Sequence, residues 1–368
     1  MENTIEQKRA RHKRFFQPLE KGEGAYISVT SPVNDTGKLP VDVPPPKDIE
    51  EQWLSVDYTV KCAEAGAQNT YFGLDALQSV FINFGPGVQA AFVGAPYKLM
   101  PGTIWFDLDP PVKDWNTPHI FKTDKNHELY KVIEAKTKAL CAASKGKYAV
   151  SVTDIGGQMD VLFSLRGEDI LTDLIEYPDE VKDAENQLAD DWINYFNTMA
   201  DMIGPTGCGY TAWIPIVSDK PWYPIQCDLS VMISPAMFEE FVLPPLDKVS
   251  TAIGRSIYHL DGPEEIVHLD MLLSLKHVDG IQWVPLPTMK HGTEISKQNF
   301  ADEMSLDIYR RSLVAGKKVI ILNVPTEQIK IVFDTIGSDG IFVSTHFDTR
   351  KEADEFIEHA VKMKWVKI

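Results

Sequence analysis

The sequence predicts an α/β fold, a (β/α)8 TIM barrel with an N-terminal extension or insertion that covers the barrel mouth. Three observations lead to this fold. From about residue 147, short β-branched runs alternate with helical patterns; polar side chains collect at one end of those runs; and 368 residues suit one such barrel. We therefore expect a single domain over 1–368, with 31–146 as an elaborated insertion and 147–365 as the strand and helix repeats.

Eight short runs are expected to form the parallel strands. They cover residues 25–30, 147–153, 209–215, 224–232, 255–259, 280–284, 318–322 and 340–345. Apolar residues at helical spacing predict the helices between them, over residues 178–203, 235–253, 264–275, 301–315, 326–336 and 350–362. Ser234 before Pro235 is typical of a helix start, and Gly254 of a helix end. Strands and helices in alternation favour a parallel sheet.

The region 31–146 differs from the rest of the chain. It is rich in proline, glycine and aromatic residues, and it carries one long helical pattern, over 126–144. We interpret it as an insertion after the first strand.

Charge and composition exclude several classes of partner. The net charge is −17, and the Lys/Arg cluster at residues 8–14 is expected to be a solvated helix face, so no nucleic-acid partner is expected. No apolar run is long enough for a membrane helix or resembles a signal peptide, so we expect no membrane association and a cytoplasmic location. The four cysteines are far apart and form no CxxC pair, which favours free thiols.

His259 and Asp261 form the most informative pair of the sequence. They end a short apolar strand two residues apart, and alternation places both on the same side of that strand. Other polar and aromatic residues follow the remaining strands: Asp154, Trp213, Gln226, Asp228, Gln282, Trp283, Asn323 and His346. Because the carboxyl ends of barrel strands share one rim, we expect one active-site cavity there.

Each of these residues also has a structural interpretation. Asp261 could cap the next helix, each histidine could be a hydrogen-bonded structural residue, and Trp213 and Trp283 could pack in the core. Together, however, His259, Asp261 and His346 would supply two imidazoles and a carboxylate, a ligand set of catalytic zinc that also serves Fe(II). The spacing does not choose the metal. A glycine-rich phosphate loop and a GxSxG elbow are both absent from the sequence.

Three segments carry a family resemblance. Residues 232–245, the run Tyr258-His259-Leu260-Asp261-Gly262 and residues 279–283 resemble the uroporphyrinogen decarboxylase superfamily, over roughly 145–365, with a weaker likeness at 84–87. The resemblance implies a (β/α)8 barrel with its cleft at the carboxyl rim. It also implies one of two activities: porphyrinogen decarboxylation without a cofactor, or zinc-dependent methyl transfer to or from a corrinoid protein.

Two departures from the family pattern favour the corrinoid-dependent methyltransferase branch over the true porphyrinogen decarboxylases. The decarboxylases carry an arginine-rich N-terminal motif, in a context like RQAGRY, which this sequence lacks. The methyltransferases carry a His-x-Cys pair and a later cysteine; here the pair becomes His259-x-Asp261, and His346 stands at the last position. Nitrogen and oxygen ligands make a harder, more Lewis-acidic site, which suits an oxygen-bearing substrate.

The resemblance therefore implies an O-demethylating methyltransferase. It would move a methyl group from a small-molecule O-methyl donor, an aromatic methyl ether, to the cobalt of a separate corrinoid protein. The chain has no DxHxxG corrinoid signature, so cobalamin must arrive on that partner. Catalysis is assigned to Asp154, Asp228 and His259, and the metal, most simply zinc, to His259, Asp261 and His346. Substrate binding is assigned to Trp213, Tyr223, Gln226, Tyr258, Gln282, Trp283 and Asn323.

Two other functions stay open. One is a cofactor-free, decarboxylase-like lyase acting on a small carboxylic acid, with Asp154 or Asp228 as the acid or base. The other is a barrel that binds a ligand without catalysis. The sequence names neither the methyl donor nor the metal, and it leaves the oligomeric state open, with a homodimer as one option.

Overall fold

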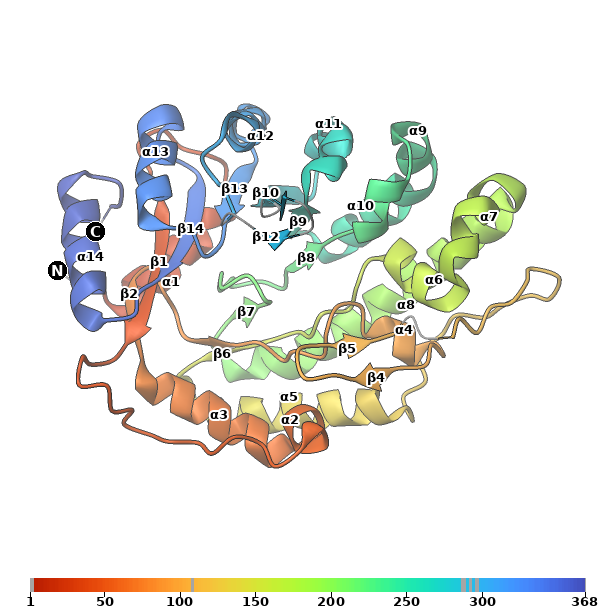
Figure 1. Ribbon diagram of the computed structural model, residues 1–368, viewed down its shortest axis with the longest axis horizontal. Helices are drawn as coiled ribbons and strands as arrows, with labels where there is room; N and C mark the ends of the chain where they lie inside the picture. The colour runs from red at the N-terminus through yellow and green to blue at the C-terminus, as the bar shows by residue number, and fades with distance from the viewer. Residues whose placement is uncertain (1–2, 107–108, 286–288, 291–292, 295–297, 368) are drawn as a thin grey trace.

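The computed structural model describes residues 3–106, 109–285, 289–290, 293–294 and 298–367. Parallel strands form the centre of the molecule, and helices lie around their outside (Figure 1). No helix in the described ranges is long and apolar enough to span a membrane.

The strands form two main sheets and two hairpins. A seven-stranded sheet has the order β2-β1-β14-β13-β10-β9-β8, in which only β2 runs antiparallel to its neighbour. A second sheet, β3-β6-β7, is parallel, and β4-β5 and β11-β12 are antiparallel pairs. The bounds are β1 Tyr26–Pro32, β2 Thr70–Leu74, β3 Ser79–Val80, β4 Lys98–Leu99, β5 Ile104–Trp105, β6 Ala149–Ser151, β7 Tyr210–Thr211, β8 Tyr223–Ile225, β9 Ser256–Asp261, β10 Val278–Val284, β11 Met289–Lys290, β12 Thr293–Glu294, β13 Lys318–Ile321 and β14 Ile341–His346.

The predicted closed barrel is found only in part. The parallel strands and alternating helices are present, but no ladder among the described residues joins β7 to β8 or β2 to β3. Tyr210 of β7 instead bridges Ser218 in the antiparallel sense. The segment between β7 and β8 also contains Pro215 and Pro221, which cannot donate a hydrogen bond to a ladder. Within the described ranges, the two sheets are therefore not joined by backbone ladders at either pair of edges.

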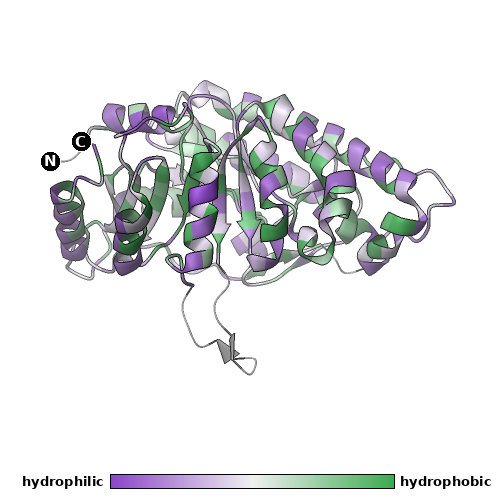
Figure 2. Ribbon diagram, turned by 90° about the horizontal axis from the view of Figure 1, so that it is seen from above, coloured by the Kyte–Doolittle hydropathy of each residue, from purple (hydrophilic) through white to green (hydrophobic). Residues whose placement is uncertain are grey.

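Helices lie in each range where the apolar periodicity predicts them, although 264–275 begins as a 3-10 segment, Pro263–His268. Additional helices lie in the insertion and, unpredicted, at α6 and α7 between β6 and α8. The bounds of the helices are α1 Ile5–Phe15, α2 Ile49–Leu54, α3 Val56–Asn69, α4 Gln89–Phe92, α5 Glu128–Ser144, α6 Gln158–Arg166, α7 Ile170–Glu176, α8 Pro178–Ile203, α9 Pro235–Met237, α10 Leu243–Ile253, α11 Leu269–Ser274, α12 Glu303–Val314, α13 Thr326–Ile336 and α14 Arg350–Lys362. Hydrophilic and hydrophobic residues alternate along the outer helices, as in amphipathic helices (Figure 2).

The helix predicted over 235–253 is present as three consecutive helical segments without a gap. A π-helical turn, Phe238–Val242, joins α9 to α10. The Ser234 hydroxyl accepts from the Met237 amide at the start, and Gly254 ends α10 with a φ of 76°. The predicted strand at 224–232, by contrast, is wrong beyond residue 225, because Asp228–Met232 forms a 3-10 turn.

The region 31–146 does more than cover the strands. It supplies β2 to the edge of one sheet and β3 to the edge of the other, while α3 packs on α5 outside them. Its β4-β5 hairpin reaches the cavity that is described below.

The N-terminal helix α1 closes the amino ends of the strands. Phe15 packs edge to face on Tyr26 and Phe342, at the starts of β1 and β14. The expectation of a solvated basic face is partly wrong, because Lys8 and His12 are buried, and Arg11 pairs with the buried Asp75. Much of the basic cluster at residues 8–14 therefore packs against the rest of the protein instead of facing solvent.

Candidate active site

Three side chains at the carboxyl ends of neighbouring strands form a group suited to a metal ion. Asp228 follows β8, while His259 and Asp261 lie at the end of β9. Their ligand atoms lie within 4.8 Å of one another, and His259 Nε2 is 3.9 Å from Asp261 Oδ2. In the described part of the chain, no other group of three His, Cys, Asp or Glu side chains has its ligand atoms this close together.

Gln282 on β10 orients the His259 ring. It faces His259 in the β9-β10 ladder, and its Oε1 lies 2.6 Å from His259 Nδ1. Since an amide oxygen only accepts, Nδ1 donates the proton, and the lone pair of Nε2 stays available on the side of Asp261. Trp213 contacts the same ring edge to face, with 6.1 Å between the ring centroids. This arrangement is typical of a metal-binding histidine with an outer-shell partner.

Asp154 belongs to the same neighbourhood. It follows β6 and accepts hydrogen bonds from the Gly156 amide at 3.0 Å and the Tyr223 hydroxyl at 3.3 Å. Burial raises its pKa to about 6, although the nearby His259 opposes this increase. Asp154 therefore changes charge close to neutral pH.

A cavity of about 320 Å³ adjoins the group; we call it the acidic cavity. Its lining is Pro86, Gly87, Ile104, Trp105, Phe106, Gly156, Asp160, Phe163, Ser164, Gln226, Asp228, Leu229 and Met232. Asp228 belongs to both the cavity and the ligand group. Among the described lining residues there is no Lys, Arg or His.

The two carboxyl groups of this cavity bind protons more tightly than usual. Burial, followed by the charge of Asp228, raises the pKa of Asp160 to about 7. Loss of water, followed by Asp261 and Asp154, raises the pKa of Asp228 to about 7 as well. Asp160 Oδ1 accepts from the Leu229 amide at 2.9 Å, whereas its Oδ2 has no hydrogen-bond partner.

Several cavity residues escaped the sequence reasoning. Asp160 lies in the first turn of α6, three residues after Gly157, and only its closeness to Asp154 in the sequence could have drawn attention to it. Trp105 and Phe106 belong to or follow the β4-β5 hairpin of the insertion, where no strand pattern was evident. Of the residues predicted to bind substrate, Gln226 does line the acidic cavity.

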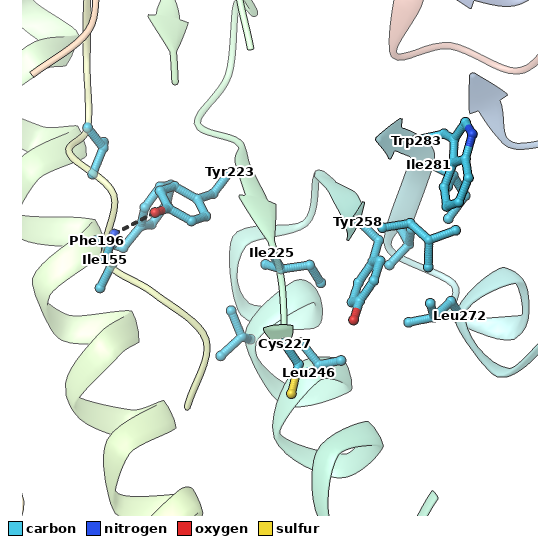
Figure 3. Close-up of a cluster of buried hydrophobic side chains, with 14 of the residues drawn as sticks. Ile155, Phe196, Tyr223, Ile225, Cys227, Leu246, Tyr258, Leu272, Ile281 and Trp283 are labelled. Atoms are coloured by element: carbon cyan, nitrogen blue, oxygen red, sulfur yellow. Dashed lines mark hydrogen bonds between the residues drawn. The ribbon is translucent and has the colours of Figure 1, made fainter. Parts of the chain in front are cut away.

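Tyr258 and Trp283 lie elsewhere than predicted. They alternate with His259 and Gln282 along β9 and β10, so they point to the opposite face. Figure 3 shows Tyr258 in a hydrophobic cluster with Leu246 and Leu272, and Trp283 beside Ile281. Both are fully buried, and the Trp283 indole donates to the Ser305 hydroxyl of α12 at 2.9 Å. Tyr223 is also buried, with its hydroxyl against Asp154.

His346 is not a member of the ligand group. Its Nδ1 lies 3.0 Å from the Thr30 hydroxyl, and with Asn323 it lines a separate groove beside α13 and α14. The strand order explains this. β14 is three strands away from β9, about 14 Å at the usual strand spacing, whereas β8 is next to β9. Asp228 therefore takes the place that we expected for His346.

Glu265 lies behind the site. It accepts from the Asp261 amide at 3.3 Å, and its other oxygen has no partner. Burial, followed by the charge of Asp228, raises its pKa to about 9. Glu265 is therefore neutral at pH 7.

Comparison with known proteins concerns the fold alone. No family model matches the sequence, and no curated protein matches it. A candidate alpha-L-fucosidase from Bacteroides thetaiotaomicron aligns at 9% identity over 95% of this chain and 98% of its own, but its TM-score of 0.28 carries no argument. A methyltransferase from Methanosarcina mazei aligns with a TM-score of 0.62 over 97% of this chain and 98% of its own, at 11% identity. This chain therefore has a fold similar to that of the Methanosarcina methyltransferase.

Proposed function

We propose that this protein is a methyltransferase that takes a methyl group from an aromatic methyl ether and passes it to the cobalt of a separate corrinoid protein. The observation that carries the proposal is the group of Asp228, His259 and Asp261 at the edge of an aromatic, acidic cavity. The fold of the Methanosarcina methyltransferase and the motifs around His259 support the same class of reaction.

The ligand group fits a divalent metal, for which zinc is the first candidate. One imidazole and two carboxylates are within reach of a single ion, and the hydrogen bond from His259 Nδ1 to Gln282 leaves Nε2 free to bind it. When bound, such an ion supplies Lewis acidity to the oxygen of the donor. Three protein ligands also leave room for that oxygen.

The acidic cavity fits a flat, uncharged ring. Trp105, Phe106 and Phe163 offer aromatic surfaces, and 320 Å³ is within the usual size of small-molecule sites. These side chains would hold the methyl ether with its oxygen toward Asp228. The described lining disfavours a carboxylate on that ring, because it has no Lys, Arg or His to pair with one.

Asp160 is suited to interact with the oxygen that loses the methyl group. Its pKa of about 7 lets it keep a proton near neutral pH, and the residue belongs to the cavity lining. A protonated carboxyl there can donate a hydrogen bond as negative charge develops on the oxygen. The alternative lyase acting on a small carboxylic acid is disfavoured, because the described cavity lining offers no cation to bind such a substrate.

Anaerobic methyl transfer tests the proposal. The protein is purified without chelators, its metal content is measured by mass spectrometry, and 2-methoxyphenol is supplied with cob(I)alamin as the acceptor. We expect stoichiometric metal, a change of corrinoid absorbance and release of catechol. Absence of demethylation with any of a panel of aromatic methyl ethers, with both cob(I)alamin and corrinoid proteins as acceptors, would reject the proposal. Full activity in metal-free protein would reject the metal assignment.

A further inference from the structure

A second cavity, of about 560 Å³, lies outside the candidate active site. Its lining residues come from α2, α3 and α5, from β2 and β3, whose sheet edges no described ladder joins, and from the segment after β3. We call it the lysine cavity, after Lys136 of α5. It shares no described lining residue with the acidic cavity.

The walls of the lysine cavity are largely apolar. Phe72 and Phe84 come from the strand side, Trp53 comes from α2, and Tyr58 and Cys62 come from α3. Burial, followed by the neighbouring Cys62 thiol, raises the pKa of the Tyr58 hydroxyl. A cavity of this size and lining is typical of a small-molecule site.

Lys136 places a buried positive charge in these walls. The residue is 3% exposed; its Nζ donates to the Trp53 carbonyl and lies 4.8 Å from the centroid of the Phe84 ring. Burial lowers its pKa to about 8, so the amine is still mostly protonated at pH 7. The one ionisable group that acts on it among the described residues is the Cys62 thiol.

Two other cations that are largely shielded from solvent are paired with carboxylates. Lys318 contacts Glu23, and Arg11 contacts Asp75. Lys136 makes no such ion pair within the described ranges, although burying an ammonium ion without a counter-charge is unfavourable. Since Lys136 lines a cavity, the missing counter-charge can come from a ligand.

We propose that the lysine cavity binds a small molecule that carries one carboxylate on an apolar body. The carboxylate accepts a hydrogen bond from Lys136 Nζ, and the apolar body packs on Phe72 and Phe84. This site is independent of the methyltransferase proposal.

Alkylation of Cys62 provides a readout at the cavity itself. Cys62 is exposed and lines the cavity, whereas Cys208 and Cys227 are buried and Cys141 is half-buried. Benzoate is the probe, benzyl alcohol is its uncharged counterpart, and peptide mass spectrometry follows the reaction of Cys62 with iodoacetamide. We expect benzoate to slow this reaction at concentrations about tenfold below those that benzyl alcohol needs, the effect of one charge-assisted hydrogen bond.

Two variants on α5 complete the test. Lys136→Met should weaken the protection by benzoate about tenfold and leave that by benzyl alcohol unchanged. Lys138→Met is the matched control, because Lys138 is exposed and pairs with Glu134 at 3.1 Å; its protection by benzoate should equal that of the wild type. Circular dichroism establishes that both variants fold.

Equal protection by benzoate and benzyl alcohol in the wild type would overturn the proposal without any variant. Unchanged protection by benzoate in a folded Lys136→Met protein would overturn it too. Neither outcome depends on a corrinoid or a methyl donor, so the two proposals fail separately.

Discussion

The two cavities of this protein are lined by ionisable groups of opposite sign, and the described lining of each has no side chain of the other sign. In the acidic cavity, the pKa values of Asp160 and Asp228 rise to about 7. In the lysine cavity, the pKa of Lys136 falls to about 8. Desolvation drives both changes, because it disfavours whichever form is charged. The comparison teaches that a cavity with unpaired charge selects its ligand by charge as well as by shape.

Among the variants near the acidic cavity, loss of His259 should have the largest effect on metal binding and methyl transfer. His259→Ala removes the one imidazole of the ligand group, so we expect loss of bound metal and a decrease of about a thousandfold or more in methyl transfer. Metal analysis and the corrinoid assay measure both. His277→Ala, at the amino end of β10, is the control and should change neither.

Replacing His346 distinguishes two assignments of the third metal ligand: Asp228, from the structure, and His346, from the family motif. The structure puts His346 against Thr30 in another groove, so His346→Ala should retain the metal. If metal is lost in His346→Ala and retained in Asp228→Asn, the motif is right and the ligand group described above is wrong.

Removing the support of His259 should have a smaller effect. Gln282→Leu deletes the acceptor for Nδ1 and frees the ring to rotate, so we expect metal affinity to fall about 10-fold to 100-fold. Competition with a chromogenic chelator measures this affinity. An affinity equal to that of the wild type would show that Gln282 does not orient the ring.

The charge of the methyl donor tests the acidic cavity directly. We expect 2-methoxyphenol to be used at least about tenfold better, in kcat/KM, than 4-hydroxy-3-methoxybenzoate, because the described lining has no Lys, Arg or His to pair with a carboxylate that loses its water on binding. Met232→Lys, at the mouth of the cavity, should narrow this preference. The control is Val231→Lys, an exposed neighbour that does not line the cavity. A higher kcat/KM for the benzoate would show that the acidic cavity does not select against a carboxylate.

The smallest expected effect concerns stability and pH. The pKa of Glu265 is about 9 in the folded protein against an ordinary 4.5, so its neutral form stabilises the fold. This stabilisation is complete below the unfolded pKa and is lost as the pH rises through 9. In metal-free protein, Glu265→Gln should raise the melting temperature by about 2–4 °C at pH 9 but not at pH 5. Glu264→Gln, exposed in the same turn, should behave as the wild type at both pH values.

Much of the strand and helix order could be predicted from local patterns. β9, β10, β13 and β14 coincide closely with β-branched runs, and α8 and α13 with apolar periodicity. β2 and β3 were missed, because Thr70–Leu74 and Ser79–Val80 become strands by pairing with β1 and β6, which lie elsewhere in the chain. Closure of the barrel was predicted from the number of strands, whereas the ladders depend on the two-residue lengths of β3 and β7.

The sequence by itself determined that His259 and Asp261 lie side by side, since alternation along a strand is a local property of its backbone. Only the tertiary structure decided that Asp228, and not His346, joins them, because this depends on which strands are neighbours in the sheet. It also decided that Asp160 and the aromatic residues of the insertion share the cavity, and that Lys136 has no carboxylate partner among the residues that the structure describes. Contacts between residues far apart in the sequence result from long-range packing, and the spacing of residues within one segment does not predict them.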